Sequence, residues 1–215
     1  MSKDEERSVA AGRLRVVPTD PSEVRALYDE WADGYEADLD AWDYRTPVDV
    51  AELLLGAQPD AARVLDVGCG TGRSGRALHA AGFTSLVGCD LSSAAIAVAE
   101  ATGVYERVVE VDLHRLPLPF ADNEFAALTC VGVMTYLPDT DAIVREFCRI
   151  VRAGGTIVIS QREDVWLERN CRELIDRLDR DGVCEAVRQS EPRPYLPGND
   201  EMADVRVILC VLRKR

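Results

Sequence analysis

The sequence predicts an α/β protein built on a doubly wound, mainly parallel sheet with helices on both faces. Short apolar runs of strand length alternate with segments of helical periodicity along the 215 residues, as in successive strand–helix–strand units. One run, Val64–Val67, leads directly into the glycines of residues 68–72, and the next, Leu86–Asp90, ends in an acid. Because parallel strands present their carboxyl ends at one edge of the sheet, we expect both features to face one ligand crevice.

The chain length is typical of a single domain with its own core. Residues 1–18 are polar and lack periodicity, so they are predicted to form a mobile tail. The single domain is then expected over residues 19–215. Within it, residues 19–56 are predicted to supply helices that precede the sheet, and residues 63–163 the core that holds the ligand.

Two helices are predicted ahead of the first strand. The first is capped by Asp20, and the second begins at Thr46 and ends at Gly56. Apolar and aromatic residues of the first helix form one stripe at helical spacing, namely Val24, Leu27, Tyr28, Trp31 and Tyr35. Such a stripe commonly packs against a sheet, but three aromatic rings are more than packing requires. We therefore expect the three aromatic side chains also to cover a ligand.

The glycine-rich turn after the first strand is predicted to hold a nucleotide-like ligand. Gly68, Gly70 and Gly72 alternate with Cys69 and Thr71, and glycine lets the backbone approach a bound molecule closely. A helix is expected directly after the turn, so that its first amide groups face the ligand. The spacing differs from that of dinucleotide folds, which place a glycine where this chain has Arg73. Together with Asp66 inside the strand, this disfavours a nicotinamide-dependent oxidoreductase.

Later segments continue the alternation. Ser92 can cap a helix over 93–101, and the third strand, 107–111, leads to Asp112. His114 follows in a proline-containing loop near the expected pocket mouth. The fourth strand is expected over 125–131, and a helix capped by Asp139 or Thr140 is predicted to stop at Gly154.

The end of the chain is predicted to complete the sheet. A fifth strand over 156–160 delivers Gln161, Arg162 and Glu163 to the same edge as Asp90. A further helix is expected to close at Gly182. The last two strands are predicted over 183–189 and 204–212, joined by a proline-rich loop of the kind that often shapes a substrate pocket.

These residues resemble the class I S-adenosylmethionine-dependent methyltransferases. The resemblance covers residues 20–163: the run D-V-G-C-G-T-G at 66–72 is similar to the first motif of that family, Asp90 to its ribose acid, and Asp112 with its apolar neighbours to the acid beside adenine. The segments 28–35 and 103–105 resemble most the methyltransferase-like proteins of the Williams–Beuren region. The family resemblance implies a Rossmann-like sheet of seven strands in the order 3-2-1-4-5-7-6, with the seventh strand antiparallel.

The resemblance also implies roles for individual residues. Asp66 would contact the cofactor's ammonium group, directly or through water, Asp90 the ribose hydroxyls and Asp112 the adenine amino group. Backbone and apolar groups would surround the rest of the cofactor: Gly68, Cys69, Gly70, Gly72, Leu91, Leu113 and Val131. The first helix would cover it with Tyr28, Trp31 and Tyr35.

The implied reaction is transfer of a methyl group by in-line displacement to an oxygen or nitrogen nucleophile of a small-molecule acceptor. Two positions depart from the family pattern: Ala126 stands where an aspartate is common, and Thr135-Tyr136 where many small-molecule relatives carry histidines. Tyr136, His114 and Glu163 are then the candidates to take the acceptor's proton. A protein that binds the cofactor without catalysis, as a sensor or assembly partner, fits the same cofactor residues.

Composition limits the partners. The net charge is −13, from 25 basic and 38 acidic side chains, which argues against nucleic acid. No apolar stretch approaches the roughly 20 residues that span a bilayer, and residues 1–7 resemble no signal peptide, so a cytoplasmic protein without a membrane partner is expected. The seven cysteines include no C-x-x-C pair and the chain has two histidines, which predicts reduced thiols and no metal site. A monomer and a homodimer are both compatible with the sequence.

Overall fold

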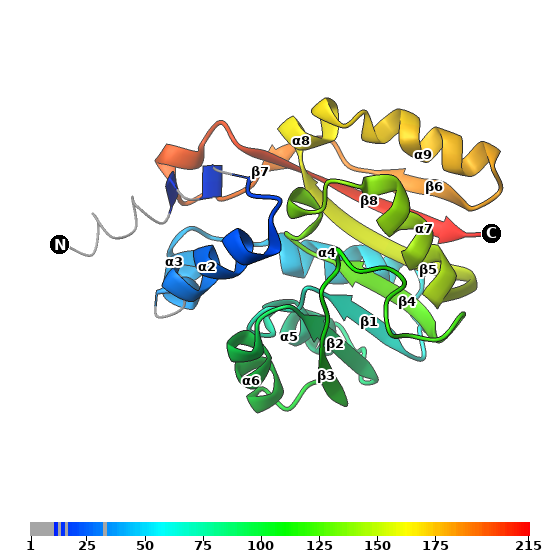
Figure 1. The fold of residues 1–215 in the computed structure, drawn as a ribbon, viewed down its shortest axis with the longest axis horizontal. Coiled ribbons are helices and arrows are strands. Elements are labelled where there is room, and N and C mark those ends of the chain that lie inside the picture. Colours follow the sequence, from blue (N-terminus) through cyan, green and yellow to red (C-terminus); the bar gives the residue numbers. More distant parts are fainter. Residues whose placement is uncertain (1–10, 13, 16, 32–33) are drawn as a thin grey trace.

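The computed structural model describes residues 11–12, 14–15, 17–31 and 34–215 (Figure 1). The described strands are β1 (Val64–Val67), β2 (Leu86–Asp90), β3 (Arg107–Glu110), β4 (Phe125–Cys130), β5 (Val151–Arg162), β6 (Cys184–Gln189), β7 (Arg193–Pro194) and β8 (Arg206–Lys214). The helices whose bounds are described are α2 (Pro21–Trp31), α3 (Tyr35–Ala41), α4 (Thr46–Ala57), α5 (Arg73–Ala80), α6 (Ser93–Ala101), α7 (Thr140–Ile150), α8 (Glu163–Glu168) and α9 (Cys171–Arg180). Two short 3₁₀ helices are η1 (Met134–Tyr136) and η2 (Asp200–Met202).

The strands form one sheet in the order β3-β2-β1-β4-β5-β8-β6, and β7 pairs with β8. Strands β1 to β5 are parallel to one another, whereas β8 is antiparallel to both β5 and β6. The predicted order is confirmed, with β8 as its seventh strand, because the two-residue β7 was not expected. In the register of the central strands, Val67 pairs with Cys89 on one side and Cys130 on the other, so β1, β2 and β4 end side by side.

Two layers of helices cover the sheet. On one face α4 and α5 pack on the strands through an apolar cluster that includes Leu54, Leu78 and Val158. On the other face α7 and α9 pack through a second cluster that includes Phe147 and Leu178. All four residues of β1 and all six of β4 are buried, as expected for central strands covered on both faces.

The helices α2 and α3 stand apart from both layers, at one end of the sheet (Figure 1). They belong to a third apolar cluster that joins Trp31, Leu39 and Trp42 to Leu196 and Met202 of the segment between β7 and β8. We call α2 and α3 together the lid. Its position at the sheet end, beside the strand tips, is what creates the cavity described below.

The described part of the expected N-terminal tail is packed against the lid. Ala11 and Leu14 are 1% and 5% exposed and belong to the third cluster. The Arg162 side chain donates to the carbonyl of Leu14 at 2.6 Å. These two positions of the segment predicted as a mobile tail are packed in the structure, because their apolar side chains find a partner surface in the lid. Residues 1–10 lie outside the described chain.

Three other predicted boundaries differ from the structure. The lid is two helices and not one, since α2 ends at Trp31 and Gly34 caps α3. Gly56 lies inside α4, whose end is held by Gln58, because the Gln58 side chain accepts from the Thr156 amide of β5 at 3.0 Å. Strand β5 is longer than expected because Val151, directly after α7, already pairs with Phe125.

Candidate functional site

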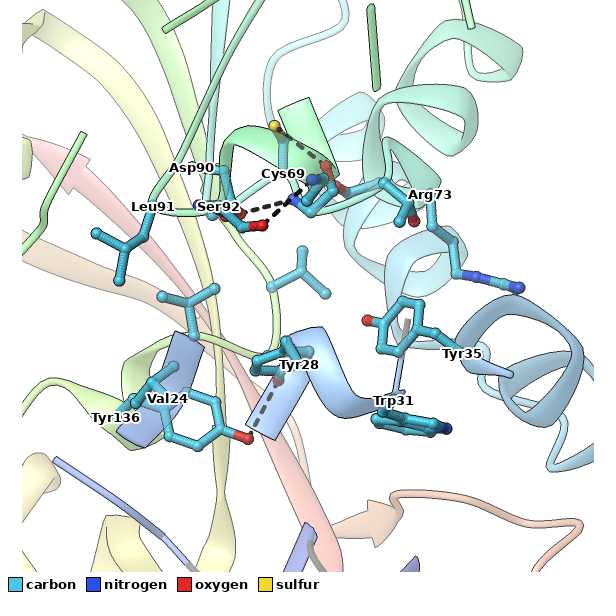
Figure 2. A pocket seen from close by; sticks show the side chains of 18 of the residues that line it. Val24, Tyr28, Trp31, Tyr35, Cys69, Arg73, Asp90, Leu91, Ser92 and Tyr136 are labelled. Carbon is cyan, nitrogen blue, oxygen red and sulfur yellow. Dashed lines mark hydrogen bonds between the residues drawn. The ribbon is translucent and has the colours of Figure 1, made fainter. Parts of the chain in front are cut away.

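A cavity of about 370 Å³ lies between the lid and the tips of the central strands, within the size range of small-molecule sites. Figure 2 shows Cys69, Asp90 and Leu91 on one side of it and Tyr28, Trp31 and Tyr136 on the opposite side. Most of the predicted cofactor residues line it: Tyr28, Trp31, Tyr35, Gly68, Cys69, Gly70, Asp90, Leu91, Leu113 and Val131. The predicted residues Asp66, Gly72, Asp112 and Glu163 do not.

The glycine turn gives the cavity a wall of bare backbone. Gly70 has φ +53°, a conformation that few other residues adopt, and a Cβ placed on it would meet no atom within 4 Å. Gly72 has φ +89° and serves packing instead, because a Cβ there would lie 3.1 Å from the Thr102 side chain. The turn therefore offers open space to a ligand at Gly70 and close helix contact at Gly72.

Asp90 is held rigidly at the tip of β2. Its carboxylate accepts from the Gly70 amide at 2.8 Å and from the Ser92 amide at 2.9 Å (Figure 2). Burial raises the pKa of this carboxyl and the backbone amides oppose that rise. Each oxygen keeps a further lone pair, so the carboxylate can accept two hydroxyl groups of a ligand in a fixed orientation.

Asp66 lies beneath the glycine turn and not in the cavity. It is fully buried and accepts hydrogen bonds from Ser74 at 2.6 Å, Tyr105 at 2.7 Å and Thr129 at 3.1 Å. Burial raises its pKa, and the three hydroxyls oppose that rise. These three hydrogen bonds join β1 to α5, β4 and the segment before β3.

Tyr105 completes this arrangement, and sequence reasoning about the site missed it. Its ring fills the space above two glycines: a Cβ on Gly75 would lie 2.1 Å from the Tyr105 hydroxyl, and a Cβ on Gly88 would lie 3.2 Å from the ring. Tyr105 belongs to the segment 103–105, which carries part of the family resemblance. Its packing role could not be predicted from that segment, because the role depends on glycines in α5 and β2 that only the fold brings together.

The carboxylate of Asp112, which follows β3, is bound by neighbouring groups of its own loop. Asp112 accepts from the His114 amide at 3.0 Å, lies 3.2 Å from the His114 ring nitrogen Nδ1 and pairs with Arg115 at 3.2 Å. Leu113 and His114 line the cavity, but β3 is three strands from β4 in the sheet. At about 4.8 Å per strand, His114 belongs to the far side of the cavity from the β4 tip.

The lid closes the cavity with aromatic rings. Tyr28 and Tyr35 meet edge to face at a centroid distance of 5.9 Å, and Trp31 and Tyr35 at 4.7 Å. The Tyr28 hydroxyl donates to that of Tyr136 at 3.1 Å, which ties the lid to η1 (Figure 2). At the other side of α2, Arg25 donates to the Leu91 carbonyl at 3.0 Å. Tyr28 and Trp31 of α2 thus line the cavity together with Tyr35, which comes from the second helix of the lid.

An ion-pair cluster that the sequence did not predict joins the lid to the glycine turn. Glu36 of α3 accepts from Arg73 at 2.8 Å, from Arg76 at 2.9 Å and from the Thr71 hydroxyl. Arg73 also pairs with Asp40 at 2.7 Å. Both arginines lie in the first turn of α5, where positive charge is unfavourable, so Glu36 compensates them. The partners are too far apart in sequence to be paired from it.

The described residues show neither of two alternative kinds of site. No three of their histidine, cysteine, aspartate or glutamate side chains gather in the way that ligands of a metal ion do. In the same part of the chain, the helices are too short or too polar for one to cross a bilayer. All seven cysteines are buried as free thiols.

Comparison with known proteins places this geometry among methyltransferases. The model of a family described as "Methyltransferase domain" matches residues 65–159. Human methyltransferase-like protein 27 is 30% identical over 198 residues, which cover 87% of this chain and 80% of that protein. A ubiquinone biosynthesis O-methyltransferase of Alkalilimnicola ehrlichii is 33% identical over 115 residues, 52% of this chain and 45% of the relative.

Solved structures share the fold at lower sequence identity. A geranyl diphosphate methyltransferase in complex with S-adenosylmethionine has a TM-score of 0.64 and 19% identity, covering 85% of this chain and 91% of the other. A possible histamine N-methyltransferase of Thermotoga maritima has a TM-score of 0.63 and 17% identity, covering 87% and 98%. These likenesses support the architecture of the sheet and of the layers around it.

Proposed function

Because the chain belongs to the class I S-adenosylmethionine-dependent methyltransferases, we propose that it methylates an oxygen or nitrogen nucleophile of a small-molecule acceptor by in-line displacement. One observation carries this proposal: a single cavity joins the glycine turn and Asp90 to the tip of β4 and the tyrosines around it. A cofactor and an acceptor can therefore meet in a common space that the lid covers.

The residues of the cavity fit the cofactor. The open space at Gly70 leaves room for the cofactor's methionine part against bare backbone, and the oriented carboxylate of Asp90 is suited to the two ribose hydroxyls. Leu91 and Leu113, which follow β2 and β3, offer apolar surface for the adenine ring. Asp66 and Asp112 are left out of these contacts, since their carboxylates are engaged outside the cavity wall.

When bound, S-adenosylmethionine supplies a methyl group on a positively charged sulfur that leaves as a neutral thioether. The protein's contribution is then mainly to align the acceptor and to exclude water. Tyr28, Trp31 and Tyr35 do the latter by covering the cavity with three packed rings. Val131 at the β4 tip borders the space between the two ligands.

Tyr136 is best suited to orient the nucleophile. Burial raises the pKa of its hydroxyl, although the hydrogen bond from Tyr28 opposes that rise, so Tyr136 keeps its proton at neutral pH. His114 lines the cavity on the β3 side, and Glu163, the first residue of α8, does not line it. Neither is placed to take a proton at the β4 tip.

Two measurements on the purified protein test the proposal. Calorimetric titration with S-adenosylmethionine should show binding, and incubation with a pool of small molecules should release S-adenosylhomocysteine in an acceptor-dependent way. Binding without release from any fraction of the pool would contradict the proposed transfer. Absence of binding would contradict the assignment of the cavity to the cofactor.

A further inference from the structure

The end of the cavity at the β4 tip is bordered by tyrosine hydroxyls. Gly132 follows β4 with φ +73°, and its amide donates to the Ser160 hydroxyl at 2.8 Å. A Cβ placed on Gly132 would lie 3.1 Å from the Tyr44 hydroxyl oxygen and 3.9 Å from that of Tyr195. The two rings meet edge to face at 5.4 Å. We call Tyr44, Tyr136 and Tyr195, with Tyr28 above them, the tyrosine end.

Charged side chains of the described cavity wall gather elsewhere. Asp90 ends β2 and His114 follows β3, and Arg25 reaches the Leu91 carbonyl on that same side. Asp29 shares a helix face with Arg25 because the two are four residues apart on α2. The charge of Arg73 is compensated by Glu36 and Asp40.

The tyrosine end offers hydrogen-bond donors. The positive charge of Arg162 acts on Tyr136 and Tyr195, but Arg162 does not line the cavity and its guanidinium is paired with Asp164. Burial raises the pKa of Tyr28, Tyr44 and Tyr195, so these hydroxyls stay protonated at neutral pH. Tyr136 accepts a hydrogen bond from Tyr28, so its own hydroxyl hydrogen is left for another partner. Nearby apolar lining from Leu14, Leu39 and Pro47 adds surface that favours apolar atoms.

We propose that the tyrosine end selects acceptors that are uncharged and largely apolar and that present an oxygen atom to the tyrosine hydroxyls. The proposal rests on the proposed function, because it places the acceptor at the β4 tip opposite the cofactor. An ionised acceptor would lose its water here, and that desolvation is costly. No charged side chain of the described wall lies at the tyrosine end to compensate it, and the nearby Arg162 is already paired with Asp164 and bonded to the Leu14 carbonyl. A neutral hydroxyl or carbonyl oxygen would instead gain a hydrogen bond from a tyrosine.

Three probes of one shape test the selection. The protein is first saturated with S-adenosylhomocysteine and then titrated calorimetrically at pH 7 with 2-naphthol, 2-naphthoate and 2-naphthylmethylammonium. We expect 2-naphthol to bind with a Kd at least tenfold lower than that of either ion. An ion that binds as tightly as 2-naphthol would overturn the inference and leave the methyltransferase assignment intact, whereas failure to bind S-adenosylhomocysteine would remove the proposed function on which it rests.

A charge introduced at the tyrosine end gives a second test. The variant Tyr195→Lys should bind 2-naphthoate at least tenfold more tightly, relative to 2-naphthol, than the unaltered protein does. Val187→Lys adds the same charge at an exposed position on β6 and should leave the ratio unchanged. Each variant is compared only if it retains affinity for S-adenosylhomocysteine. An unchanged ratio in a Tyr195→Lys protein that does so would count against the proposed position of the acceptor, and the three-probe comparison stands without the variant.

Discussion

The Arg73 guanidinium donates to the Glu36 carboxylate at 2.8 Å and so ties α3 of the lid to the first turn of α5. The same carboxylate accepts from Arg76 and from Thr71 of the glycine turn. Glu36 therefore joins the lid to the proposed cofactor wall through three partners. A change in that side chain should affect how long the cofactor stays bound.

Replacing Glu36 by Gln should weaken binding of S-adenosylhomocysteine by about two- to tenfold, mainly through faster dissociation. The pair is partly exposed, with 38% of the Glu36 side chain accessible, so only about 0.5–1.4 kcal/mol is expected from its loss. Stopped-flow displacement measures the dissociation rate. Glu52→Gln, at an exposed position on α4, is the matched control, and equal rates in both variants would contradict a role for Glu36 in closing the lid.

Replacing Asp90 by Ala should abolish measurable binding of S-adenosylhomocysteine, with a loss of at least a hundredfold in affinity. Two charge-assisted hydrogen bonds to the ribose would be lost, at about 1.5–3 kcal/mol each. The Gly70 and Ser92 amides would lose their acceptor as well. Calorimetry measures the affinity, with Asp60→Ala at an exposed position before β1 as the control. Unchanged affinity in the Asp90 variant would refute the ribose assignment.

Replacing Tyr105 by Phe should lower the free energy of unfolding by about 1–3 kcal/mol, because the buried Asp66 carboxylate would lose one of its three hydroxyl donors. The ring itself would still fill the space over Gly75 and Gly88. Urea unfolding followed by fluorescence measures the difference. A stability equal to that of the unaltered protein would mean that the hydroxyl is dispensable to Asp66.

Titration of Asp66 should contribute to the pH dependence of the free energy of unfolding. Burial raises its pKa above the usual value of 3.8, so the folded state binds this proton more tightly than the unfolded chain does. The stabilisation is fully present below the unfolded pKa and is lost as the pH rises through the folded pKa. Relative to Asp66→Asn, the unaltered protein should therefore gain stability between pH 7 and pH 4. A stability difference between the two proteins that stays constant over this range would show that the carboxyl titrates as it does in the unfolded chain.

Local signals allowed much of the fold to be predicted. Ser92 caps α6 by accepting from the Ala95 amide, and Asp139 caps α7 by accepting from the Ala142 amide, as the residue types suggested. Asp90 lies at a strand tip because the apolar run before it has strand length. These features depend only on residues close together in the sequence. The order of the strands in the sheet does not, and its prediction came from the family resemblance.

Features that depend on distant segments were not predictable in this way. The sequence placed Asp66 beside the glycines but could not show its hydroxyl partners, which come from α5, β4 and residue 105. Glu36 and Arg73 are brought together only by the folding of the lid over α5. The same holds for Tyr44 and Tyr195, which lie at opposite ends of the sequence and meet over Gly132.

The hydrogen bond from Arg162 to the Leu14 carbonyl bears on how recombinant versions of this protein should be made. Leu14 lines the same cavity as the tyrosines. Deletion of residues 1–15 would therefore remove part of the cavity wall and admit water and bulkier compounds from that side. A screen for acceptors with the shortened protein would then measure the selectivity of an enlarged cavity. Libraries of candidate acceptors are better tested on the intact polypeptide, with any purification tag attached at the other terminus.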